Sequence, residues 1–286
     1  MKYNVSNDLK FISSFLSITY DRLANLMDIP FETISRIVNE SLYPSDDLLE
    51  KIYSFIFDKG IKLNQIKVEA YKRKHNVLLF HGSKSIVVGK PSFEYSRKNV
   101  DFGVGFYLGD NYEQSLEFIS QTKQGNLYVF SCDYKGLKIL ELDVSLDWML
   151  YIAYCRQRLE EYSDTAKYQS IKDMLNDYDV VIAPIADNRM FTTIDDFVNS
   201  AISSKQAMHA LKDLSLGKQI VFKTKKALKR LKMLETLYVC KKEKALAKEK
   251  KIQKIFDSES YIVNAYKTYK RQGLYIEEIF NDEKDG

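Results

Sequence analysis

The first sixty residues carry apolar side chains at helical spacing. In TYDRLANLMDIPFETISRIVNE, residues 19–40, apolar positions recur every three or four residues on both sides of Asp28 and Pro30, which suit a helix stop and a restart. A further pattern begins at Pro44 and ends at Gly60, with Ser45 as its expected N-cap. The pattern therefore predicts a cluster of short helices over residues 1–62, followed by a helical connector over residues 63–76.

From Val77 to about Leu234 the pattern changes to short apolar runs that are typical of strands. Helix-like stretches such as NYEQSLEFISQT and KQAMHALKDL lie between these runs without regular alternation, which favours an α+β fold over a doubly wound sheet. The predicted strands are VLLF, LYVFSC, LKILEL, DVVIAPI and QIVFKT.

After Thr224 the sequence predicts a long, basic, helical extension. Residues 223–271 contain 16 Lys and Arg against 5 Asp and Glu. One interpretation is an amphipathic helix that packs on the domain and keeps its charges in solvent. The other is a helix that binds nucleic acid through phosphates. The apolar positions of the expected packed helix are Leu231, Leu234, Leu237 and Ile252.

Composition indicates a globular chain, with 286 residues of which 45% are hydrophobic and 29% charged. The three cysteines, Cys132, Cys155 and Cys240, form no CxxC pair and no metal-ligand spacing, so we expect a reduced, cytoplasmic protein without a metal. The first residues do not read as a signal peptide, and no apolar run reaches the roughly 18 residues of a membrane helix.

The segments LANLMDIPFETISRIVN and PSDDLLEKIYSF resemble the XRE-type helix-turn-helix of repressors. The resemblance implies a recognition helix over residues 31–40 that contacts DNA through Thr33, Ser35 and Arg36, and it is compatible with a homodimer. However, residues 1–72 carry 9 basic and 10 acidic side chains, which is not the basic footprint of a strong DNA binder. Dimerisation or docking of a partner remains the alternative role.

Two later segments bring a histidine, glycines, aromatics and a hydroxyl into one candidate pocket. His81 ends an apolar run and precedes Gly82, whose backbone a ligand can approach closely. In DFGVGFYLGDNYEQSLEF, residues 101–118, Tyr107 is expected on a glycine-rich turn, and Ser115 and Phe118 share one face of a helix expected to begin near Asn111. Such a set suits a flat heteroaromatic amide.

This arrangement resembles the nicotinamide pocket of the ADP-ribosyltransferase fold, in its diphtheria-toxin and poly(ADP-ribose) polymerase branch. That branch has a histidine-glycine pair, then a tyrosine with a serine eight positions and an aromatic eleven positions later, as here. The resemblance implies that a histidine bonds the adenosine-side ribose of NAD, a glycine backbone and a serine hold the carboxamide, and two aromatics sandwich the ring. The matching residues are His81, Gly82, Ser83, Tyr107, Ser115 and Phe118.

LGKQIVFKTKKAL, residues 216–228, resembles the late strand of that branch that opens with a catalytic acid, and Gln219 takes the place of the acid. A neutral amide bonds a ribose hydroxyl but does not act as a base. The departure therefore favours transfer of a single ADP-ribose over polymer synthesis. Members of the fold that lack this acid include inactive ones, so a pseudoenzyme remains the alternative.

The run APIADNRMF, residues 183–191, follows a predicted strand, where loops commonly face a site. We expect Arg189 to pair with the NAD pyrophosphate or an anionic acceptor, with Arg97 as its rival, and Asp187 to act as an acceptor-side base. An internal turn with an Asp–Arg pair is the alternative. The helix-turn-helix head followed by a domain with this run resembles an uncharacterised bacterial and phage group.

The sequence thus predicts a helix-turn-helix domain, an ADP-ribosyltransferase-like split-sheet domain over residues 77–235 and a basic helical extension over residues 236–286. The expected activity is mono-ADP-ribosyl transfer from NAD to a protein or nucleic acid, as an intracellular toxin or phage-defence factor. The alternative is a DNA-binding regulator that senses NAD through a non-catalytic fold.

Overall fold

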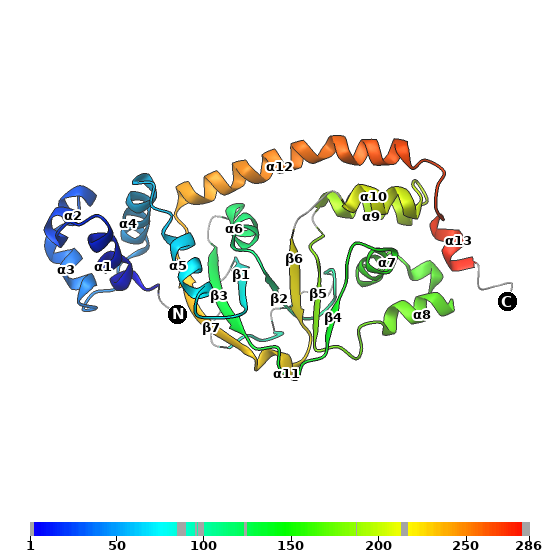
Figure 1. Cartoon of the computed structure of the whole chain (residues 1–286), viewed down its shortest axis with the longest axis horizontal. Coiled ribbons are helices and arrows are strands. Elements are labelled where there is room, and N and C mark those ends of the chain that lie inside the picture. Colours follow the sequence, from blue (N-terminus) through cyan, green and yellow to red (C-terminus); the bar gives the residue numbers. More distant parts are fainter. Residues whose placement is uncertain are drawn as a thin grey trace. The chain divides into compact units, whose positions relative to one another are not determined.

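The structure of the chain, a computed structural model, describes residues 3–84, 90–94, 96, 100–122, 125–186, 188–212 and 217–281 (Figure 1). The chain forms two compact units, each built from segments that are distant in sequence. Unit 1 comprises Met1–Lys90, Ser115–Cys132 and Lys232–Glu249, and unit 2 comprises Pro91–Gln114, Asp133–Leu231 and Lys250–Gly286. The domain ranges expected from the sequence stay a prediction.

The helices expected at the start of unit 1 are confirmed. Side chains cap two of them: Thr19 accepts a hydrogen bond from the Arg22 amide, and Ser45 accepts one from the Leu48 amide. The helix expected over residues 31–40 ends earlier, at Val38. The bounds are α1 Val5–Phe15, α2 Tyr20–Met27, α3 Phe31–Val38, α4 Asp46–Asp58 and α5 Leu63–Lys72.

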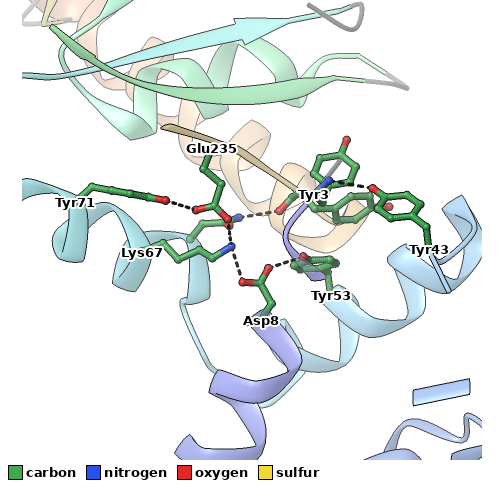
Figure 2. A network of polar contacts seen from close by, with 9 residues as sticks. Tyr3, Asp8, Tyr43, Tyr53, Lys67, Tyr71 and Glu235 are labelled. Atoms are coloured by element: carbon green, nitrogen blue, oxygen red, sulfur yellow. Dashed lines mark hydrogen bonds and ion pairs between the residues drawn. The ribbon is translucent and has the colours of Figure 1, made fainter. Parts of the chain in front are cut away.

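A buried polar network joins three of these helices to strand β7 (Leu231–Leu237) in unit 1 (Figure 2). The Lys67 ammonium lies 2.6 Å from Asp8 Oδ1 and 2.6 Å from Glu235 Oε1. Tyr53 donates to Asp8 at 2.5 Å, and Tyr71 donates to Glu235 at 3.0 Å. One half-buried cation is therefore shared by two buried carboxylates that are 227 positions apart in the sequence.

The sheet strands of unit 1 are β1 (Leu78–Ser83), β3 (Asn126–Cys132) and β7, with β3 between the other two. β1 and β3 pair antiparallel. The expected helix over this part of the basic extension is wrong, because residues 231–237 form β7. Leucines three residues apart fit a helical spacing, whereas the neighbour that makes this segment a strand, β3, is about a hundred residues away.

The strands of unit 2 lie in the order β4, β5, β6, β2. β4 and β5 are parallel, whereas β5 with β6 and β6 with β2 are antiparallel, so this part of the sheet is mixed. The FYLG segment, expected as part of a glycine-rich turn, is strand β2, because it pairs with β6 over its whole length. The bounds are β2 Phe106–Gly109, β4 Ile139–Glu141, β5 Val180–Pro184 and β6 Lys218–Phe222.

Helices α7 (Leu146–Cys155), α9 (Asn188–Val198) and α10 (Ser204–Lys212) pack with β5 and β6 in one core cluster, which contains the fully buried Trp148. The chain is therefore a mixed α and β protein, as the short apolar runs predict. In the described part of the chain, no helix has the length and apolar character that a membrane crossing needs. The remaining bounds are α6 Tyr112–Ser120, α8 Ala166–Asp173, α11 Lys225–Leu228, α12 Lys241–Thr268 and α13 Ile276–Asn281, with a 3-10 turn at Glu160–Tyr162.

Candidate functional site

In unit 1, the end of β1 lies directly against α6. A Cβ placed on Gly82 would be 2.8 Å from the Ser115 carbonyl oxygen, closer than Cβ atoms come to other atoms in proteins, and 3.1 Å from Phe118 Cδ1, which is a tight contact. Glycine is thus required at this crossing. The crossing brings three expected site residues together: Gly82 at the strand end, Ser115 with a buried side chain, and Phe118, which is 50% exposed.

His81 and Ser83 flank this crossing on β1. His81 is half-buried and pairs with Tyr128 of β3, with the two ring centroids 6.2 Å apart. Ser83 is also half-buried and pairs with Asn126. The histidine therefore lies at a partly exposed strand end and is not sealed in the core, as a site residue requires.

In unit 2, Tyr107 of β2 fixes the glycine-rich loop that precedes it. Its hydroxyl donates to the Gly103 carbonyl at 2.6 Å and accepts from the Phe102 amide at 3.1 Å. Burial raises the pKa of Tyr107 well above its usual value, so the phenol stays protonated at neutral pH. The ring packs against the core around Trp148. Tyr107 and Phe118 belong to different units, so the ring sandwich stays a prediction.

Gln219 lies at the start of β6, opposite Gly109 of β2 and Ala183 of β5. The residue is buried, and its Nε2 donates to Asp101 Oδ2 at 3.0 Å and to the Pro184 carbonyl at 3.2 Å. Sequence reasoning missed Asp101. In the sequence, Asp101 stands out only as an acid directly before the glycine-rich run. Asp101 contacts Gln219 only in the folded structure of that loop.

Asp101 connects Gln219 to a small pocket in unit 2. Its Oδ1 accepts a hydrogen bond from Arg156 Nη2 at 3.0 Å. The Arg156 guanidinium lies over the Phe191 ring, and its Nε is buried without a hydrogen-bond partner among the described residues. Arg158 pairs with Asp195 at 3.0 Å. The pocket has a volume of about 160 Å³ and is lined by Ala153, Arg156, Arg158, Phe191, Ile194 and Asp195.

The remaining expected site residues either contact another part of unit 2 or lie outside the described residues. Arg189 donates to the Lys254 carbonyl at 3.2 Å and to the Ser258 hydroxyl, so its guanidinium is engaged with α12 within unit 2. Asp187 and Arg97 lie outside the described residues. Their expected roles stay predictions. Within the described ranges, no three His, Cys, Asp or Glu side chains are grouped as metal ligands.

The expected DNA-contact residues lie on α3 in unit 1. Arg36 is exposed, while Thr33 and Ser35 are half-buried. α2 and α3 are joined by a short turn in which Asp28 has a left-handed backbone with a φ of 52°. Of the three side chains, that of Arg36 is therefore the one most accessible to a partner.

Comparison with known proteins identifies the family of the larger part of the chain. No characterised protein and no solved structure has significant similarity to it. Residues 77–233, more than half of the sequence, match the family model described as a protein of unknown function, DUF3990. The matched range contains the β1 strand end, α6, β2 and β6. The chain therefore belongs to the DUF3990 family.

Proposed function

We propose that the protein is an NAD-dependent mono-ADP-ribosyltransferase. The observation that carries the proposal is the crossing of β1 and α6, where Gly82 allows the strand end to lie against Ser115 and Phe118. The strand-end backbone, the buried Ser115 and the half-exposed ring of Phe118 meet at this crossing. These are the groups that bind a pyridine carboxamide, because the ring stacks and the amide needs both donors and acceptors.

In this proposal the nicotinamide ring rests on Phe118, and its carboxamide bonds the Gly82 backbone and the Ser115 hydroxyl. His81 bonds the adenosine-side ribose, and Tyr107 holds the glycine-rich loop of unit 2 in place through its hydroxyl. The bond between the nicotinamide nitrogen and the anomeric carbon breaks, and nicotinamide leaves with the bonding electrons. A nucleophilic atom of the acceptor forms the new bond to that carbon and releases its proton to solvent.

The neutral side chain of Gln219 supports single transfer. An amide accepts a hydrogen bond from a ribose hydroxyl, but it has no charge with which to activate a second ADP-ribose as the next acceptor. The acceptor is a protein or a nucleic acid. The salt dependence of acceptor binding distinguishes the two. A steep loss with salt favours nucleic acid, whose phosphates the basic α12 would contact, and a flat response favours protein.

Incubation of the purified full chain with labelled NAD, alone and with lysate protein or nucleic acid, is expected to release nicotinamide and label an acceptor. We expect His81→Ala to lower turnover about 100-fold, because misplacement of the ribose weakens the reactive geometry. The control His75→Ala alters a half-buried histidine that follows α5 and contacts Tyr71, and it should leave turnover unchanged. Mass spectrometry of the lysate identifies the labelled molecule.

The same variants provide a cellular test of a toxin or phage-defence role. Expression should slow bacterial growth, and the double change His81→Ala, Tyr107→Ala should relieve the arrest. Arrest that persists in the double variant argues against catalysis as its cause. NAD binding without nicotinamide release identifies a pseudoenzyme, and absence of NAD binding contradicts the proposal.

A DNA-binding regulator is the second candidate, favoured by the short α2–α3 connection and the accessible Arg36. In that case Arg36→Ala should weaken duplex binding and reduce the salt dependence by about one released counterion. The control Lys59→Ala, at the end of α4, should change neither. Selection from random duplexes that yields no preferred sequence would dismiss this candidate, and a preference altered by NAD would support sensing.

A further inference from the structure

The amide of Gln219 has only one orientation that its neighbours accept. Its Nε2 faces two groups that can only accept hydrogen bonds, the Asp101 carboxylate at 3.0 Å and the Pro184 carbonyl at 3.2 Å. Turning the amide over would place its oxygen against two other oxygens. The hydrogen-bond network therefore assigns the nitrogen to this side and directs Oε1 away from Asp101.

Asp101 is itself held firmly enough to impose this orientation. Its side chain is 11% exposed, and its second oxygen accepts from Arg156 at 3.0 Å. Arg156 is in turn fixed over the Phe191 ring. Each carboxylate oxygen thus has its own donor, so neither is free to rotate away from Gln219.

We propose that Asp101 is a positioning residue, which fixes the Gln219 amide so that Oε1 is presented as a hydrogen-bond acceptor at the start of β6. This inference rests on the proposed NAD chemistry. None of the hydrogen bonds of the described residues uses Oε1, so this oxygen is available to a ribose hydroxyl. Gln219 then accepts a hydrogen bond from the ribose hydroxyl as a carboxylate would. The negative charge lies behind it, on Asp101, which holds the amide nitrogen.

The same geometry explains why an acid would be unfavourable at position 219. Gln219→Glu places a second carboxylate about 3 Å from Asp101, where two like charges do not both ionise. The pair would hold a proton in the folded state at a pH where the unfolded chain has lost it. Stability of this variant is therefore fully present in acid and is lost as the pH rises through the raised pKa of the pair.

The melting temperature, measured between pH 5 and pH 8.5 without NAD, tests the contact independently of any activity. Relative to the wild type, Gln219→Glu should lose about 3 °C or more on going from pH 5 to pH 8.5. The double variant Asp101→Asn, Gln219→Glu should lose this extra pH dependence, because the new amide donates to the new carboxylate. The control Asp133→Asn changes an exposed acid that faces Arg230 and should follow the wild type. Identical profiles for Gln219→Glu and the wild type would overturn the inference.

Nicotinamide release tests the positioning role. In Asp101→Asn, one carboxylate oxygen is replaced by an NH2 group. Because Arg156 needs the remaining oxygen as its acceptor, the NH2 group faces Gln219 and favours the turned-over Gln219 amide. We expect kcat to fall at least about 10-fold with KM for NAD little changed, and the double variant to recover part of kcat. Equal kcat for Asp101→Asn and the wild type would overturn the positioning role. If the wild type releases no nicotinamide, the proposed function fails, and the pH profiles still decide whether the Asp101–Gln219 contact exists.

Discussion

Replacement of Lys67 by alanine is expected to lower the free energy of unfolding of unit 1 by about 3–5 kcal/mol. Lys67 is 17% exposed and is the cation shared by Asp8 and Glu235, whose side chains are 2% and 7% exposed. Its removal leaves two buried carboxylates to which, within the described part of the chain, the hydroxyls of Tyr53 and Tyr71 still donate. Chemical denaturation followed by circular dichroism measures the loss, and hydrogen exchange assigns it to unit 1.

The matched control is Lys51→Ala, because Lys51 pairs with an almost fully exposed Asp28 and should contribute at most about 1 kcal/mol. The pH dependence provides a second check. Burial raises the pKa of Asp8 from its usual 3.8, so the stability that Asp8 contributes is present in acid and is lost as the pH rises through the folded pKa. The loss caused by Lys67→Ala should therefore shrink between pH 7 and pH 5, and a constant loss would contradict the network.

Gly82→Ala is expected to reduce nicotinamide release at least about 100-fold and to destabilise unit 1 by about 1–3 kcal/mol. The added Cβ would lie 2.8 Å from a backbone oxygen of α6 and 3.0 Å from Ile119 Cγ2, so the helix must move away from the strand. That movement displaces Ser115 and Phe118 together. Steady-state turnover and thermal unfolding of the full chain measure both effects.

The control for this substitution is Gly60→Ala. A Cβ there meets nothing within 4 Å, although the φ of +72° makes alanine cost about 1–2 kcal/mol. Turnover should stay at the wild-type level. If Gly82→Ala also retained full turnover and NAD affinity, the crossing of β1 and α6 would not be the nicotinamide site.

Local patterns in the sequence predicted most of the elements. Ser45 caps α4, Asn111 accepts from the Glu113 amide at the start of α6, and the five apolar runs correspond to β1, β3, β4, β5 and β6. The missed strands are β2, which begins just after a glycine-rich run, and β7, where leucines mimic a helix. Both are strands because of neighbours distant in sequence, a tertiary effect that a local pattern does not contain.

The candidate site was predictable where its residues belong to a short motif. The spacing of Ser115 and Phe118 on one helix placed them on one face, and the structure brings them to Gly82. The contact between Asp101 and Gln219 was not predictable, because 118 positions separate them and only the pairing of β2 with β6 brings the loop and the strand together. The same reason hid the Lys67 network.

The single tryptophan of the chain, Trp148, is fully buried in unit 2, so unit 1 contains none. Tryptophan fluorescence consequently reports the loosening of unit 2 alone, whereas circular dichroism reports both units together. The protein thus carries one built-in spectroscopic label, with which the melting of unit 2 can be distinguished from that of the whole chain without attached dyes.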